Sequence, residues 1–142
     1  MNLDALPYTS YIVLLEFCVG SLLFCVFADW RGQVAPSFVK FCSAMAAVGA
    51  AVMLLNVQAL DPKAAIGGFR LNDDVLSWVK VGSVVFTIAT VPYVWAVFRE
   101  DRQWSLITGT GATAIGFALV GVVSYYISLP TWGFAGMLLS LI

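Results

Sequence analysis

Residues 10–28 read SYIVLLEFCVGSLLFCVFA, an almost unbroken apolar run whose one charged side chain is Glu16. A helix rises about 1.5 Å per residue, so about 20 apolar residues cross a hydrocarbon core of roughly 30 Å. Backbone N–H and C=O groups find no water partners there, which leaves a helix as the expected conformation for a single stretch. This stretch therefore predicts a transmembrane helix.

Three further stretches have the same character, and polar or helix-breaking residues separate them. Asp29-Trp30-Arg31-Gly32 follows the first run, Asp61-Pro62 the second, and Leu129-Pro130 the last. We expect an all-α integral membrane protein, a four-transmembrane-helix bundle with short loops that forms a single domain over residues 1–142. The apolar tail 131–142 is too short to cross and is expected to lie in the membrane interface. The predicted helices span about 10–28, 38–58, 75–98 and 105–128.

Composition supports a membrane location and excludes several functions. The chain is 61% hydrophobic and 11% charged, with a mean hydropathy of +0.95, whereas soluble domains carry about 25% charged residues. A net charge of −1 does not provide the basic face that nucleic-acid binding requires. We therefore expect lipid and other membrane subunits as partners, and no nucleic acid.

The sequence contains no histidine and three cysteines. Haem b and most transition-metal sites in membranes use imidazole ligands, and iron–sulfur clusters need about four cysteines. We expect no metal site and no cofactor held by histidine or bound covalently. Cys18, Cys25 and Cys42 form no C-x-x-C pair and lie in apolar segments, so they are interpreted as small buried hydrophobic residues rather than as disulfide chemistry linked to a quinone.

Basic residues near the helix ends predict the orientation. The first and third loops have Arg31, Lys40, Arg99 and Arg102 beside them, while the opposite side has Lys63, Arg70 and Lys80 spread over a longer stretch. We expect the first and third loops in the cytoplasm and both termini outside, in the inner or plasma membrane of a prokaryote.

Glu16 is the most informative single residue. It lies about 10 Å into the membrane by helix rise, where an ionised carboxylate costs a few kcal/mol or more and therefore faces the bundle or a polar cavity. Two interpretations remain open. Glu16 is either a neutral acid bonded to a neighbouring helix or a group that exchanges protons with a ligand.

Further polar and small residues suggest a site and its packing. In the predicted topology, polar side chains from three helices lie in one half of the bilayer and could line a quinol-sized pocket, although interfacial tyrosines also serve as membrane anchors. Small residues at helix-packing positions predict close helix contacts. The candidate quinone and proton residues are Glu16, Asn56, Gln58, Tyr125 and Tyr126, and the candidate packing residues are Gly20, Ala46, Ala50, Ala112 and Gly116.

The pattern Leu15-Glu16-Phe17-Cys18-Val19-Gly20-Ser21-Leu22, followed by Asp29-Trp30-Arg31-Gly32, resembles the opening helices of NrfD/PsrC-type membrane subunits. The resemblance implies a haem-free four-helix bundle that holds a quinone near one membrane face and exchanges electrons with an iron–sulfur partner. It covers about the first fifty residues, and it implies a quinone-side role for Glu16 alone. Members of that family usually have eight or more helices.

Three hypotheses follow for the function. The first is a haem-free membrane subunit of a respiratory or photosynthetic electron-transfer complex, which anchors redox partner subunits, contributes to a quinone site and is not an enzyme alone. The second is a small proton-coupled transporter that acts through Glu16, since the chain is also similar to small multidrug transporters, from which its long second loop departs. The third is a structural or assembly subunit.

Overall fold

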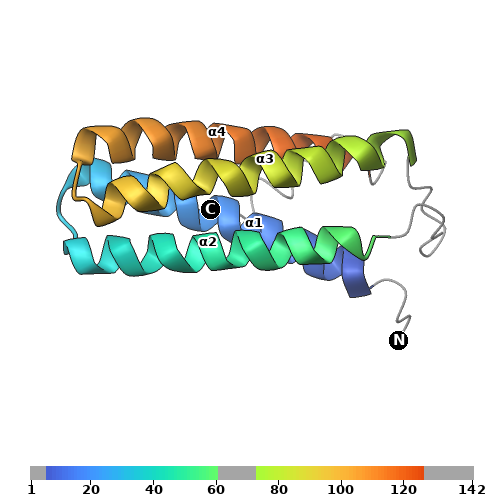
Figure 1. The fold of residues 1–142 in the computed structure, drawn as a ribbon, viewed down its shortest axis with the longest axis horizontal. Coiled ribbons are helices and arrows are strands. Elements are labelled where there is room, and N and C mark those ends of the chain that lie inside the picture. The colour runs from blue at the N-terminus through green and yellow to red at the C-terminus, as the bar shows by residue number, and fades with distance from the viewer. Residues whose placement is uncertain (1–5, 61–72, 127–142) are drawn as a thin grey trace.

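The structure is a computed structural model that describes residues 6–60 and 73–126. These residues form four helices and no strand, which confirms the predicted all-α bundle (Figure 1). The helices start three or so residues earlier than predicted, and α4 is described as far as its last residue, Tyr126. The predicted end of that helix at 128, the tail and residues 61–72 lie outside the described part. The helices are α1 (Leu6–Arg31), α2 (Pro36–Gln58), α3 (Asp73–Phe98) and α4 (Arg102–Tyr126).

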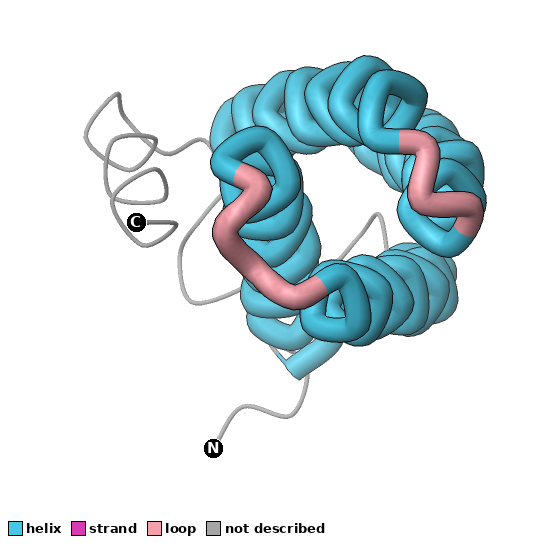
Figure 2. The backbone as a smooth tube through the Cα atoms, turned by 90° about the vertical axis from the view of Figure 1, so that its left-hand side faces the viewer, coloured by secondary structure: helices cyan, strands magenta, loops and turns pink. Residues whose placement is uncertain are grey.

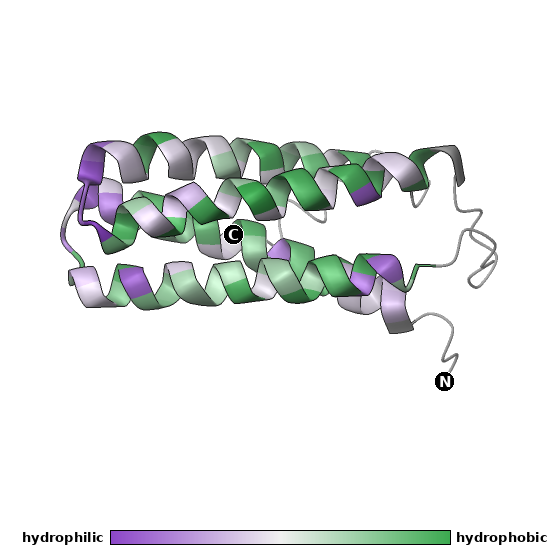
Figure 3. Cartoon of the chain, viewed as in Figure 1, coloured by the Kyte–Doolittle hydropathy of each residue, from purple (hydrophilic) through white to green (hydrophobic). Residues whose placement is uncertain are grey.

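All four helices are long and apolar enough to cross a membrane. The shortest, α2, has 23 residues, or about 35 Å at 1.5 Å per residue, which exceeds a hydrocarbon core of roughly 30 Å. Large apolar side chains on every helix point away from the bundle, among them Phe41, Leu55 and Ile88, each exposed by more than half. Such an apolar outer surface requires lipid rather than water. The chain is therefore a multi-pass integral membrane protein (Figure 3).

The helices run alternately up and down, and each packs against its two neighbours in a ring. The main contacts join α1 to α2 and α4, and join α3 to the same two helices, as the view along the bundle shows (Figure 2). The two short connections, between α1 and α2 and between α3 and α4, lie together at one end (Figure 1). We call this the short-loop end. Several residues at this end are hydrophilic (Figure 3).

The short connections are built from ordinary helix-ending residues. Gly32 has a φ of 65°, the left-handed conformation that glycine adopts at a helix C-terminus, and Pro36 occupies the first turn of α2. Glu100 also has a positive φ, 61°, and ends α3. Asp101 Oδ1 then accepts a hydrogen bond of 3.3 Å from the backbone N–H of Trp104, which caps the start of α4.

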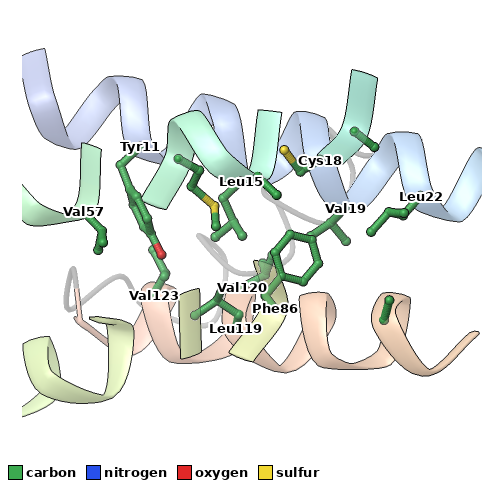
Figure 4. Close-up of a cluster of buried hydrophobic side chains, with 14 of the residues drawn as sticks. Tyr11, Leu15, Cys18, Val19, Leu22, Val57, Phe86, Leu119, Val120 and Val123 are labelled. Atoms are coloured by element: carbon green, nitrogen blue, oxygen red, sulfur yellow. The ribbon is translucent and has the colours of Figure 1, made fainter. Parts of the chain in front are cut away.

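The core combines interlocked apolar side chains with small residues that let the helices approach (Figure 4). Leu15, Val19 and Leu22 of α1 are at most 2% exposed. A Cβ atom placed on Gly116 of α4 would lie only 2.7 Å from Val19 Cγ2 and 2.8 Å from Phe86 Cε2. The other small residues of the predicted packing set are likewise buried, with the exception of Gly20: Ala46, Ala50 and Ala112.

Candidate functional site

The polar residues predicted to form a quinone pocket occupy separate places. Glu16 is partly buried, and no hydrogen bond or ion pair joins it to another described residue. The Asn56 amide donates a hydrogen bond of 3.0 Å to the Val52 carbonyl of its own helix, Gln58 is exposed, and Tyr125 is 67% exposed. The side chain of Tyr126 lies outside the described part. The predicted pocket stays a prediction.

Helix geometry explains the position of Glu16. At about 100° per residue, it lies a quarter-turn or so from the buried Leu15, on the side where Val19 meets α4 rather than on the side where Cys18 meets α2. Gly20 follows one turn further along the helix. The carboxyl group is therefore at the outer edge of the bundle, one turn from the groove that Gly20 lines.

A groove between α1 and α2 opens towards the lipid and has a volume of about 410 Å³. Its residues on α1 follow the spacing i, i+3, i+4, i+7, i+8, which places them on one helix face. Three phenylalanine rings, each at least half exposed, stand at its sides, and two thiols and one hydroxyl supply its side-chain polar atoms. We call it the thiol groove. Its residues are Phe17, Gly20, Ser21, Phe24 and Cys25 of α1 and Phe41, Cys42 and Met45 of α2.

The two thiols of this groove come from different helices, Cys25 from α1 and Cys42 from α2, and both line the same hollow. Cys25 is six residues before the end of α1 at Arg31, and Cys42 is six residues after the start of α2 at Pro36. Because the two helices are antiparallel and joined by a short connection, both residues lie about 9 Å from the short-loop end. Cys25 is 1% exposed and Cys42 is partly buried, and both are free thiols.

Tyr93 of α3 brings a third polar group to the inner side of the thiols. Its side chain is fully buried, and its hydroxyl is the one buried side-chain polar atom of the described residues without a hydrogen-bond partner. Cys25, Asp29 and Cys42 are the titratable groups near it, but none meets the geometry of a hydrogen bond. A buried hydroxyl left without a partner costs about 1–3 kcal/mol. Tyr93 therefore places an unsatisfied hydroxyl near the two cysteines.

A second, polar hollow of about 300 Å³ lies at the short-loop end. Asp29, one helical turn beyond Cys25, accepts a hydrogen bond from the Ser105 hydroxyl of α4. Arg102 donates a hydrogen bond of 2.8 Å to the Trp30 carbonyl. The acid, the hydroxyl and Arg102 all line this hollow. Polar groups thus extend from the aqueous end of the bundle towards Tyr93 and the thiols.

One ion pair spans the same end. Lys40 Nζ of α2 lies 2.6 Å from Glu100 Oε1 in the connection between α3 and α4. The hydrogen bond from Lys40, and then its positive charge, hold the pKa of Glu100 below its ordinary value of 4.5. The Glu100 side chain is 66% exposed, so water and salt screen the pair. It joins α2 to the connection between α3 and α4 at the outer surface of the short-loop end.

Comparison with protein-family models, curated proteins and solved structures found no match to this chain. The similarity to NrfD/PsrC-type subunits stays a prediction, and the site rests on its own geometry.

A third hollow, an apolar groove of about 680 Å³, lies between α3 and α4. Tyr125 and Trp78 stand beside it, and both are about two-thirds exposed. Gly82, Ala118 and Gly121 leave the space at its floor. Tyr125 is thus the one predicted quinone residue that lines a described hollow. This groove offers a shape for an acyl or isoprenoid chain but few polar atoms.

The sequence analysis missed the thiol pair because it considered cysteines by their spacing along the chain. Cys25 and Cys42 are 17 positions apart, far from a C-x-x-C motif. The signal that could have found them is their equal distance from the connection between two antiparallel helices. Burial of Cys18 and Cys25 confirms that they are packed as small hydrophobic residues. Cys25 also shares a groove with Cys42, which makes it a candidate for thiol chemistry.

Proposed function

We propose that this protein is a haem-free membrane subunit that binds a quinone in the thiol groove and works within a membrane electron-transfer complex. One observation carries the proposal: an apolar groove that faces the lipid has three aromatic side walls and hydrogen-bonding groups at its floor. Ligand sites generally combine such an apolar lining with a few polar groups that orient the ligand.

The dimensions and chemistry of the thiol groove fit a quinone ring. A volume of about 410 Å³ lies within the usual range of about 300–1,000 Å³ for small-molecule sites. Phe17, Phe24 and Phe41 can stack on or against the ring, and the Ser21 hydroxyl can donate a hydrogen bond to a quinone oxygen. The isoprenoid tail would leave through the open side into the lipid.

Quinone chemistry also requires protons, and the chain has two candidate sources. Glu16 lies one helical turn from Gly20, which lines the groove, and it makes no hydrogen bond or ion pair with another described residue. Asp29 and Ser105 form a polar contact at the aqueous end of the same half of the bundle. We propose that Glu16 exchanges a proton at the quinone, as the sequence analysis suggested, and that Asp29 connects the site to water.

Electron transfer would need partner subunits, because this chain would supply the quinone site rather than a redox metal. The short-loop end presents both signs of charge, through Lys40, Glu100, Asp101 and Arg102, and it provides a polar surface on which a redox protein could dock. Purification in a mild detergent, followed by mass spectrometry, identifies such partners and any bound quinone.

A photoreactive azidoquinone tests the quinone site in nanodiscs. We expect labelling within residues 17–25 and 41–45, competition by unlabelled quinone, and reduced labelling in Phe41→Ala. Phe38→Ala is the matched control, because Phe38 is also an exposed phenylalanine of α2 but does not line the groove. Labelling that is spread over the lipid surface, or that Phe41→Ala leaves unchanged, would overturn the proposal.

Proton-coupled transport by a homo-oligomer is a second candidate, favoured by the position of Glu16. A partly buried acid in a membrane span that has no partner among the described residues is a candidate to interact with a second subunit or a substrate. Uptake of cationic substrates into proteoliposomes tests this function. The idea fails if Glu16→Gln transports as well as the wild type.

A further inference from the structure

We infer that Cys25 and Cys42 form a redox pair that reduces the quinone bound in the thiol groove and closes a disulfide between α1 and α2. This inference rests on the proposed quinone site and adds a reaction to it. Both cysteines line the same groove as the three phenylalanine rings. A ligand that enters from the lipid would therefore meet the two sulfur atoms at the floor of its site.

The architecture brings the sulfur atoms together without help from a local motif. The antiparallel α1–α2 hairpin places the two residues at one level, six positions from either side of its connection. Both thiols line the same groove. A disulfide needs Cβ atoms about 3.5–4.5 Å apart, and α1 and α2 approach closely along this hairpin, since a Cβ atom on Gly49 of α2 would lie only 2.8 Å from Cys18 Sγ of α1.

The proposed step balances in atoms and electrons. One thiol loses its proton, and the resulting thiolate adds to the quinone ring to form a carbon–sulfur bond. The second sulfur atom then attacks the first, the sulfur–sulfur bond forms, and the carbon–sulfur bond breaks with its electron pair returning to the ring. The two cysteines are oxidised by two electrons, the quinone is reduced by two, and the two thiol protons end on the quinol oxygens.

Tyr93 gives this reaction a polar neighbour on the side away from the lipid. Its hydroxyl is fully buried and has no hydrogen-bond partner among the described residues, and both cysteines are among the titratable groups near it. A thiolate, rather than a thiol, is the nucleophile in such exchange, and a phenol can donate a hydrogen bond to it. We assign Tyr93 as a positioning residue, since it does not line the groove that would hold the quinone.

The chain contains a matched control for both cysteines. Cys18 is also a buried thiol of α1, but it does not line the groove. Its sulfur lies against Gly49 instead, where a Cβ atom would be 2.8 Å away. Cys18→Ser thus removes another buried thiol of α1 and leaves Cys25 and Cys42 unchanged.

The test uses the full chain in nanodiscs. The protein is first reduced with dithiothreitol, and the dithiothreitol is then removed under anaerobic conditions. Addition of decylubiquinone should produce one quinol per protein, seen as the loss of quinone absorbance. A Cys25–Cys42 disulfide should appear in the peptide map of the same sample. Cys25→Ser and Cys42→Ser should lower quinol formation to the level of empty nanodiscs, while Cys18→Ser should match the wild type. Tyr93→Phe should slow the step but leave its stoichiometry unchanged.

The azidoquinone experiment separates this inference from the proposed function. If the groove is labelled but the wild type forms neither quinol nor the Cys25–Cys42 disulfide, the redox pair is overturned and the quinone site stands. If the groove is not labelled, the quinone site itself fails. Because the disulfide is measured in the wild type, misfolding of a cysteine variant would not protect the inference. A disulfide through Cys18 would also contradict it.

Discussion

The hydroxyl groups of Tyr11 on α1 and Ser83 on α3 lie 2.7 Å apart in the buried centre of the bundle. The Ser83 hydroxyl also donates a hydrogen bond of 2.7 Å to the Val79 carbonyl of its own helix, so the Tyr11 hydroxyl acts as the donor towards it. The contact joins two helices that face each other across the ring rather than two neighbours. It is a polar tie between two helices in a mainly apolar core.

Tyr11→Phe should lower the free energy of unfolding by about 0.6–1 kcal/mol, the usual worth of an interhelical hydrogen bond in a membrane. Ser83 keeps its bond to Val79, so no group is left without a partner. Reversible unfolding in mixed micelles measures the change. Tyr125→Phe serves as control, because that side chain is exposed to lipid. Equal stability of the Tyr11 variant and the wild type would contradict this account.

Gly116→Ala should destabilise the bundle by about 1–3 kcal/mol, the usual cost of overpacking a core. The added methyl group would lie 2.7 Å from Val19 Cγ2 and 2.8 Å from Phe86 Cε2, so α4 must move away from both helices. Gly111→Ala provides the comparison, because a Cβ atom there has open space around it. Thermal unfolding in detergent should distinguish the two variants. If they unfold alike, the close approach of α4 is wrong.

The Lys40–Glu100 pair should make stability depend on pH in the acid range. Since the folded pKa of Glu100 lies below the unfolded value near 4.5, the unfolded chain binds more protons between the two values, and stability rises with pH there. The contribution of the pair is present above the unfolded pKa and is lost as the pH falls through the folded pKa.

The measurement for this pair is the unfolding midpoint of wild type and Glu100→Gln at pH 7 and at pH 3. The difference between the proteins should shrink at the lower pH and in high salt, which screens exposed charges. Lys40→Met removes the cation, and in that background Glu100→Gln should have no effect that depends on the ion pair. A difference that stays constant with pH would show that the pair does not act through protonation.

Glu16→Gln should leave the stability of the isolated bundle within about 0.5 kcal/mol of the wild type, as is usual for sites without specific contacts. The reason is that Glu16 makes no hydrogen bond or ion pair with the described residues. Unfolding in micelles checks this, and quinone reduction or substrate uptake in the same preparation checks its proton role. A large loss of stability would indicate that Glu16 is a structural tie between helices.

Much of the fold could be predicted from apolar runs and the residues that interrupt them. A run such as 10–28 has one stable conformation in lipid, and Gly32 and Pro36 lie where a helix must end and the next begin. The helix starts were less predictable, because polar residues such as Arg102 extend helices beyond the hydrocarbon core. Helical residues that lie in water at the end of a membrane span are not hydrophobic, so hydropathy does not mark them as part of the helix.

The site could not be predicted in the same way, because it depends on rotation and pairing of helices. A single apolar helix gives little indication of which face meets a neighbour, since lipid and protein core are equally apolar. Glu16 and Tyr125 were selected by their polar groups and their depth, and the structure leaves Glu16 partly buried and Tyr125 largely exposed. Cys25 and Cys42 have no short-range motif, and the α1–α2 hairpin brings them together.

The sequence by itself determined that its four apolar stretches are helices, because the cost of leaving backbone groups without partners in hydrocarbon permits only helices there. The tertiary structure alone decided which side chains share a surface. It placed two thiols from different helices in one groove beside three phenylalanine rings, and it buried the Tyr93 hydroxyl without a hydrogen-bond partner among the described residues. These relations arise from the rotation of each helix and from the antiparallel register of neighbouring helices. Close packing of small residues selects both, and the pattern of hydrophobic residues along the chain does not encode them.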